Sequence, residues 1–321
     1  MNVDPGSSGP MILLLAVLAA AEQPLAACIN RLAEKHDLSG VVSVAGARGE
    51  ATVARGAPAD SRFNLASAGK MFTAVAVAQL VEQGKVGLDD PIGRHVDGLS
   101  AATAAVTVRQ LLAHTGGLGN FFTPGNLPAI EKARSVSDLL PLAAADQPAF
   151  PPGSRFQYSN SGYLLLGRLI ERASGQGYGE YLASRIFRPA KMAATGLDGE
   201  GAPHGTPAGG AFSTAADMQR FFAALAGGKL VSAGMLAKLT AAGAEQPGYG
   251  LGFGTGAFEG HRWFGHNGGA PGANAETATF PGDGVTVVVL SNHSPPAATN
   301  VFRDLRQALF NAGSLAACAA P

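Results

Sequence analysis

Ser67 and Lys70 stand three residues apart in a stretch that could carry nucleophilic chemistry. From Ser67 to Gly84 the chain is rich in apolar and helix-forming residues and holds no proline, which predicts a helix ending near Gly84. Residues three apart share one face of a helix, so Lys70 would lie beside the Ser67 hydroxyl. A serine hydroxyl needs a base within hydrogen-bond reach, and a buried amine can lose its proton near neutral pH. The pair therefore indicates a serine activated by a lysine.

Ser-x-x-Lys is a weak motif by itself, because two fixed residues occur by chance in roughly one of every few chains of this length. In the plain alternative, Ser67 caps a core helix and the Lys70 ammonium lies in solvent. Other parts of the chain have to decide between the two interpretations.

Tyr158 and Asn160 form a second pair, about ninety residues after Ser67 and just before a helical pattern. A phenol whose pKa is lowered by neighbouring ammonium groups can act as a general base. An amide two residues further on can orient a substrate carbonyl or the lysine. Taken alone, Tyr158 could equally be a loop aromatic that packs over a helix, and Asn160 could be a helix N-cap.

A third candidate is His266-Asn267-Gly268-Gly269, which follows a strand-like run. A histidine at a strand end beside two glycines has side-chain access on one side and allows close backbone approach on the other. The alternative is a structural or surface histidine.

The elements that would position these residues are strands at both ends of the chain and helices between them. Strand patterns cover residues 41–45, 51–54, 250–254, 261–266, 274–280 and 285–290, with a hairpin turn at 281–284. Helical patterns cover residues 26–36, 106–113, 161–173, 181–187, 214–225 and 300–311. The proline-rich residues 120–155 suggest a long connection. This order predicts an α/β (α+β) fold, in which N- and C-terminal segments form an antiparallel sheet that is flanked by helices and interrupted by a mostly helical domain.

Composition excludes several function classes. The 321 residues carry no net charge and no run of Lys or Arg, so a nucleic-acid surface is not expected. The seven histidines are dispersed, so no metal site and no cofactor are expected. Gly-x-Ser-x-Gly does not occur, which argues against an α/β-hydrolase.

The apolar run at residues 11–21 is too short to span a membrane but suits the core of a signal peptide. We expect residues 1–21 to be a signal peptide and the protein to be exported, to the periplasm or the extracellular medium. A second interpretation is a lipoprotein signal that ends at Cys28. An exported protein with two cysteines, Cys28 and Cys318, invites a disulfide, although two unpaired thiols remain possible at this stage.

The order and spacing of the three candidate motifs resemble the serine β-lactamase and penicillin-binding-protein superfamily. The similarity is greatest to its branch of class C β-lactamases, D-alanyl-D-alanine carboxypeptidases and esterases. It extends to the segments at 108–118, 152–167 and 209–218, and covers residues 28 to 312. The resemblance implies one hydrolase domain over residues 22–321, with a sheet subdomain at about 26–65 and 246–312 and a helical subdomain at about 66–245.

The resemblance also implies residue roles. Ser67 would be the acylated nucleophile, Lys70 and Tyr158 would carry protons, and Asn160 would bind substrate. Substrate-binding roles also fall to His266, Gly268 and Gly269, and the N–H groups of Ser67 and Gly269 would form the oxyanion hole. Tyr158 would then be the base that activates water for deacylation. In the resembled fold the terminal helices pack together, which would bring Cys28 near Cys318.

One departure concerns the substrate, which should be a small ester, amide, peptide or β-lactam. Members that hydrolyse antibiotics usually carry Lys-Thr-Gly where this chain has His266-Asn267-Gly268. A lysine offers a fixed charge to a substrate carboxylate, whereas a histidine is charged only part of the time near neutrality. We therefore expect cleavage of an ester, amide or peptide bond. The alternatives are a β-lactamase or D-alanyl-D-alanine carboxypeptidase proper, and a non-catalytic sensor that binds muropeptides or β-lactams.

Overall fold

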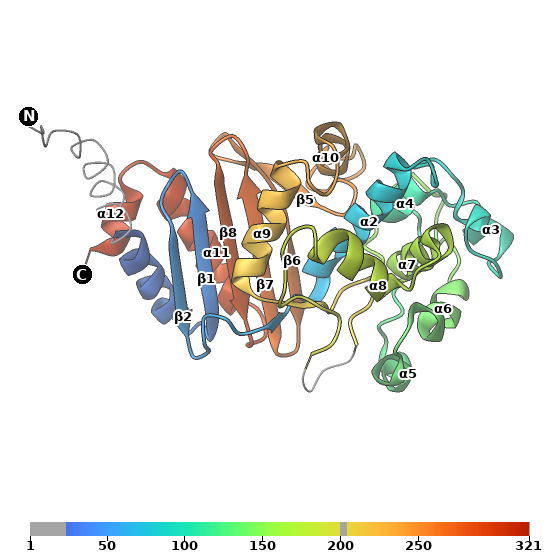
Figure 1. Cartoon of the computed structure of the whole chain (residues 1–321), viewed down its shortest axis with the longest axis horizontal. Coiled ribbons are helices and arrows are strands. Elements are labelled where there is room, and N and C mark those ends of the chain that lie inside the picture. The colour runs from blue at the N-terminus through green and yellow to red at the C-terminus, as the bar shows by residue number, and fades with distance from the viewer. Residues whose placement is uncertain (1–23, 200–203, 321) are drawn as a thin grey trace, which may run out of the picture.

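Strand-forming segments from the two ends of the chain pair in one antiparallel sheet (Figure 1). The computed structural model describes residues 24–199 and 204–320. In this part of the chain the sheet has six strands in the order β2-β1-β8-β7-β6-β5. The strands are β1 (Gly40–Gly46), β2 (Ala51–Arg55), β5 (Gly254–Phe258), β6 (His261–Ala270), β7 (Ala273–Phe280) and β8 (Val285–Ser291). The predicted antiparallel sheet with flanking helices is confirmed.

The sheet separates two apolar layers. Side chains alternate between the two faces of a strand, so Val287 and Val289 of β8 pack with α11 (Ala297–Phe310), while Val288 faces the opposite layer. That opposite layer contains α2 (Lys70–Glu82), whose residues from Lys70 to Ala78 are all buried. A helix that is apolar on every side lies inside a protein, so α2 forms the centre of the molecule.

Helices between α2 and the C-terminal strands form the second part of the molecule, to the right in Figure 1. They are α3 (Ala101–Ala104), α4 (Val108–Leu112), α5 (Leu127–Lys132), α6 (Val136–Ala144), α7 (Asn160–Ser174), α8 (Tyr178–Leu182) and α10 (Ala233–Thr240). Short turns of helix complete the set, namely η2 (Ile92–Arg94), η3 (Pro124–Asn126) and the π-helix η4 (Ala183–Phe187).

The predicted long connection at residues 120–155 is wrong, because it contains α5 and α6. Ser135 Oγ accepts from the Asp138 N–H, and Asp138 Oδ2 accepts from the Ser135 N–H; this capping box starts α6 despite the nearby prolines. Pro141 lies inside α6, so the helix forms without that residue's N–H.

Two strand boundaries also differ from the prediction. The run predicted as a strand at 250–254 is irregular until Gly254, where β5 begins. β6 continues to Ala270 because its ladder with β7 extends to the pair Ala270 and Ala273. His266 and the glycines after it therefore lie within a strand and not beyond its end.

Helix α9 (Ala215–Ala226) covers the sheet, in front of it in Figure 1. Gln219 of this helix donates to the carbonyl oxygens of Ser43 in β1 (3.1 Å) and Thr286 in β8 (3.3 Å). Thus α9 packs on the sheet although it belongs to the stretch 66–245 that was predicted as the helical subdomain.

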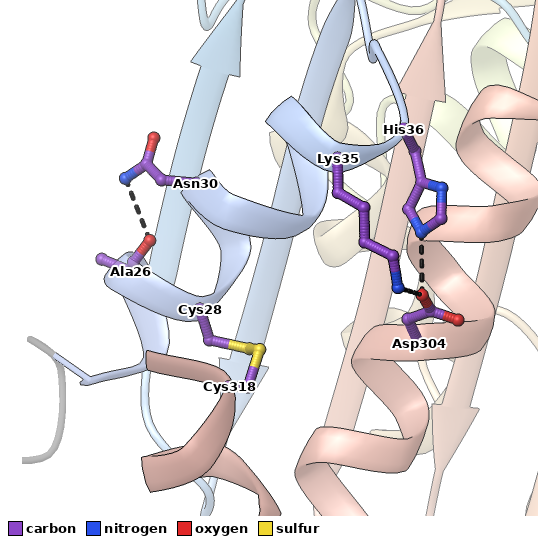
Figure 2. The surroundings of a disulfide bond; sticks show 7 residues. All are labelled: Ala26, Cys28, Asn30, Lys35, His36, Asp304 and Cys318. Atoms are coloured by element: carbon purple, nitrogen blue, oxygen red, sulfur yellow. Dashed lines mark hydrogen bonds and ion pairs between the residues drawn. A yellow bond between two sulfur atoms is a disulfide. The ribbon is translucent and has the colours of Figure 1, made fainter. Parts of the chain in front are cut away.

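The first and last helices of the described chain meet on the face of the sheet opposite α9, where Cys28 and Cys318 share one apolar layer (Figure 2). Cys28, in the helix of residues 24–35, forms a disulfide with Cys318 of α12 (Ser314–Ala319). Nearby, the side chains of Lys35 and His36 each lie 2.8 Å from Asp304 of α11.

The predicted signal peptide at residues 1–21 lies outside the described residues. In the part of the chain that the structure describes, no helix combines the length and the apolar character that crossing a membrane requires.

Candidate active site

Ser67 lies in η1 (Ala66–Gly69), a turn of 3-10 helix that leads directly into α2. β3 (Phe63–Asn64) precedes this turn and pairs with β4 (Phe212–Ser213). Ala66, just before Ser67, has a φ of +44°, a left-handed conformation that costs a non-glycine residue about 1–3 kcal/mol. The Gly210 N–H holds this residue by donating to Ala66 O at 3.0 Å. Ser67 is thus presented on a turn that a distant segment fixes.

Lys70 is buried, with no exposed surface, directly beside Ser67. Its Nζ lies 3.4 Å from Ser67 Oγ and 2.7 Å from Asn160 Oδ1, and it also bonds Ala208 O. Burial lowers the pKa of Lys70 well below its usual value, because the charged form loses its hydration.

The contacts of Lys70 are compatible with a neutral amine. An uncharged amine has two N–H donors and one lone pair. All three oxygens can accept from Lys70 when it is an ammonium; in the neutral form that burial favours, the two donors would serve Asn160 Oδ1 and Ala208 O and the lone pair would face the Ser67 hydroxyl. Lys70 can therefore take the Ser67 proton.

Tyr158 hydrogen-bonds Ser67 through its hydroxyl, and its ring lies 4.7 Å from Lys70 Nζ. The expected lowering of the Tyr158 pKa is wrong in direction. Burial raises the pKa of Tyr158 to about 12, and the bond to Ser67 offsets only part of this. The ammonium that should have lowered it is the Lys70 amine, whose own charge is disfavoured. Tyr158 is therefore a phenol at neutral pH, suited to donate or relay a proton.

Asn160 is the first residue of α7, and Ser159 caps this helix by accepting from the Gly162 N–H at 2.9 Å. The Asn160 amide is held at both ends. Its oxygen accepts from Lys70, and its nitrogen donates to Asn120 Oδ1 at 2.8 Å. Asn160 therefore orients the lysine.

β6 meets η1 at Gly268. A Cβ on Gly268 would lie 2.1 Å from Leu65 O and 3.0 Å from Ser67 N, so only glycine allows this approach. This contact brings the Ser67 N–H next to the strand, and N–H groups in the first turn of a helix have no intrahelical partner.

Gly269 N–H points away from β7. The carbonyl oxygens of His266 and Gly268 accept from Thr277 Oγ1 (2.8 Å) and Asn274 Nδ2 (3.3 Å) of β7, so these residues direct their backbone polar groups toward that strand. Backbone groups of successive strand residues alternate in direction, which turns those of Gly269 to the opposite edge. β5 pairs with β6 only as far as Gly265, so among the described residues no strand lies beside this edge at Gly269.

The side chain of His266 is buried, and both of its ring nitrogens contact other residues of the protein. Its Nδ1 lies 2.5 Å from Asn267 O, so Nδ1 carries the proton, and Nε2 accepts from the Tyr249 hydroxyl at 3.0 Å. Burial lowers the pKa of His266 to about 4, because the charged imidazole would lose its hydration. This histidine is uncharged at neutral pH and has no free ring nitrogen for a substrate carboxylate.

Three contributors to the site were missed by the sequence analysis, namely Asn120, His114 and Tyr249. Each reaches the site from a segment far from the motif residue that it contacts, and no spacing rule connects them. The segment His114-Thr115-Gly116-Gly117 was recognised only as the end of a predicted helix.

Within residues 24–199 and 204–320, no group of three or more His, Cys, Asp or Glu side chains could hold a metal ion.

A family model described as Beta-lactamase matches residues 25–312, nearly all of the described chain. The chain belongs to the Beta-lactamase family. It is a serine hydrolase of the β-lactamase fold, as the resemblance in its motifs predicted.

Relatives among known proteins support the same placement. Over 175 residues the chain is 35% identical to penicillin-binding protein 4* of Bacillus subtilis, a match that covers 50% of this chain and 38% of that protein. Protein flp of Staphylococcus aureus is 29% identical over 136 residues, covering 41% of this chain and 27% of its own length. The chain thus spans well under half the length of these relatives.

Solved structures match over more of the fold. A penicillin-binding protein from Bacillus halodurans superposes with a TM-score of 0.80 at 28% identity, covering 87% of this chain and 98% of the other. A D-stereospecific amidohydrolase from Streptomyces sp. superposes with a TM-score of 0.75 at 26% identity, covering 92% and 98%.

Proposed function

We propose that this member of the family cleaves an ester or amide bond through an acyl-enzyme on Ser67. The observation that carries the proposal is the contact, at 3.4 Å, of Ser67 Oγ with the buried Lys70 amine, whose pKa burial lowers well below its usual value. Lys70 accepts the Ser67 proton as Oγ attacks the substrate carbonyl carbon. The negative charge on the former carbonyl oxygen would be met by the N–H groups of Ser67 and Gly269.

Collapse of this intermediate expels the leaving group, which takes a proton from Lys70 through the Tyr158 hydroxyl. Water then attacks the acyl group and yields the acid and free Ser67. Because the Tyr158 pKa is about 12, we assign the base in this second step to Lys70, with Tyr158 as the relay.

The substrate class follows from the charge of the site. His266 is uncharged and bonded on both nitrogens, so it offers no cation to a substrate carboxylate. We therefore propose an ester or amide that is uncharged on the leaving-group side. The similarity to a D-stereospecific amidohydrolase is in line with an amide of this kind. A β-lactamase or D-alanyl-D-alanine carboxypeptidase, and membership of the class C branch, stay as the second candidate.

The test is hydrolysis of four substrates by the purified protein: p-nitrophenyl acetate, p-nitrophenyl butyrate, D-alanine p-nitroanilide and nitrocefin. We expect cleavage of the three substrates that lack a carboxylate, with nitrocefin inert, and loss of all activity in a folded Ser67→Ala variant. Rapid nitrocefin turnover would instead identify a β-lactamase. Activity retained by Ser67→Ala would reject the assignment of the nucleophile.

A non-catalytic sensor would form the acyl-enzyme but would not hydrolyse it. Such a protein would be labelled on Ser67 by a fluorophosphonate yet turn over none of the four substrates. The connected set of Ser67, Lys70, Tyr158 and Asn160 favours turnover, because each of them has the contacts that proton transfer needs.

We also propose export to the periplasm or the extracellular medium. The apolar run at 11–21 and the pairing of Cys28 with Cys318 support it, because disulfides persist in oxidising compartments. N-terminal sequencing of the protein from its native source tests this, since an intact residue 1 would contradict cleavage.

A further inference from the structure

His114 holds the loop that carries Tyr158 and Asn160, although neither the family motifs nor the proposed chemistry gives it a role. It follows α4 and is buried, with 1% of its surface exposed. Its Nδ1 accepts from the Ser159 N–H at 3.0 Å, and its carbonyl accepts from the Gln157 N–H at 2.8 Å. The loop is thus fixed on both sides of Tyr158.

The ring of His114 also contacts the Tyr158 side chain. The two ring centroids lie 4.1 Å apart and the ring planes are tilted by 33°, so the rings are in close contact. On its other sides the His114 ring meets Tyr163 and Tyr249, each at 5.0 Å between centroids. The Tyr158 ring therefore packs against an imidazole that cannot shift without disturbing two buried tyrosines.

The contacts fix the protonation of His114. Because Nδ1 accepts a bond, its proton must lie on Nε2, which has no hydrogen-bond partner among the described residues. A charged imidazole would carry a proton on Nδ1 as well and would break the Ser159 bond. Burial lowers the pKa of His114 well below its usual value, because the charged imidazole would lose its hydration, so the neutral form persists.

We propose that His114 is a positioning residue, which places the Tyr158 hydroxyl and the Asn160 amide by accepting the Ser159 N–H and packing against the Tyr158 ring. The proposal rests on the proposed function, since it assigns His114 a purpose in the same reaction. Ser159 stands between the two residues that contact Ser67 and Lys70, so a shift of its backbone moves both of them. Displacement by about 1 Å can cost roughly 100-fold in rate.

Two substitutions separate the acceptor from the packing. His114→Asn keeps an acceptor near the Nδ1 position and tolerates the left-handed backbone of this residue, whose φ is +58°. His114→Phe keeps an aromatic ring but has no acceptor, which leaves the Ser159 N–H unpaired. We expect kcat for p-nitrophenyl acetate to fall about 100-fold in His114→Phe with little change in KM, and to fall clearly less in His114→Asn, which keeps the acceptor and loses only the ring contact. If His114→Phe fails to fold, His114→Ala against His114→Asn gives the same comparison.

Hydrogen exchange at the Ser159 amide gives a readout that does not depend on turnover. The amide should be protected in the wild type and in His114→Asn, and exchange faster in His114→Phe. A folded His114→Phe protein with wild-type kcat, or with a protected Ser159 amide, would overturn the proposal. A wild type inert toward both the esters and the fluorophosphonate would contradict the proposed function instead, while the exchange rates would still decide the role of His114.

Discussion

Lys70 Nζ and Asn160 Oδ1 lie 2.7 Å apart, although 90 positions separate them in the sequence. Lys70 begins α2 and Asn160 begins α7, so this bond joins the first turns of the two helices. Ser67 lies one turn before Lys70, at the same junction. The site is therefore a meeting point of helix N-termini and the edge of β6, and its chemistry depends on how these elements are held together.

Replacing Lys70 by arginine should abolish the base without removing a cation. Arginine cannot lose its proton in a protein, so it cannot take one from Ser67. We expect kcat for p-nitrophenyl acetate to fall about 10²- to 10⁴-fold, the usual contribution of general base catalysis. The control is Lys85→Arg at an exposed position, which should leave kcat unchanged. A Lys70→Arg protein with near wild-type kcat would show that the base is another group.

The pH profile of kcat/KM for an uncharged ester should report Lys70. The reactive form is the neutral amine, so activity should be lost as pH falls through the lowered pKa of Lys70. The Tyr158 pKa is about 12, so its deprotonation should cause no change in rate below about pH 10. Tyr158→Phe should lower the rate but keep the acidic limb. If this variant loses the limb, the titrating group is Tyr158.

Replacing Gly268 by alanine should displace the strand from the nucleophile turn. The new Cβ would overlap Leu65 O, so β6 or η1 must move. We expect a folded protein whose kcat is about 100-fold lower, because donors to the developing oxyanion shift. Gly282→Ala is the matched control, since a Cβ there meets nothing within 4 Å and should leave kcat unchanged. Equal activity of the two variants would contradict the close approach.

Replacing His266 by lysine should favour substrates that carry a carboxylate. A charged hydrogen bond contributes about 1.5–3 kcal/mol, which corresponds to roughly 10- to 150-fold in relative kcat/KM. We expect this gain in the ratio of nitrocefin to p-nitrophenyl acetate hydrolysis in His266→Lys. His266→Gln, which is uncharged, should show no gain. An unchanged ratio in His266→Lys would separate substrate choice from the charge at this position.

Removing the disulfide should lower stability and leave catalysis intact. Cys28 packs in the layer on the opposite side of the sheet from α2. We expect Cys28→Ser combined with Cys318→Ser to lower the free energy of unfolding in urea by about 2–5 kcal/mol, with kcat unchanged at 25 °C. Two titratable thiols in the denatured, unreduced wild type would contradict the bond.

Much of the fold could be predicted because its signals are local. Several elements can be recognised from a few consecutive residues, namely the valines of β8, the apolar run of α2 and the hairpin turn at 281–284. The helices α5 and α6 could not be predicted in the same way. Their prolines indicated a loop, and the capping box between Ser135 and Asp138 overcame that signal.

The same distinction between local and distant signals applies to the candidate site. Ser67 and Lys70 could be paired from helical spacing alone, and the resemblance added Tyr158 and Asn160. The electrostatic state of the site could not be predicted, because it depends on burial by distant segments. The Tyr158 pKa is raised and not lowered. His266 is hydrogen-bonded to Tyr249, and no sequence pattern predicted that these two side chains would be in contact.

The order of strands in the sheet has a consequence for biosynthesis. β1 lies beside β8, with Gly40 paired to Ser291, so β1 must wait for a strand that is translated much later. Pairing between segments so far apart makes folding slow, because the intervening chain must be closed into a loop before contacts repay the entropy. The sheet that supports β6 cannot be complete while the ribosome is still making the C-terminal part of the chain. The hydrolase should therefore acquire its activity only after β8 has left the ribosome, and truncation before β8 should leave an inactive product.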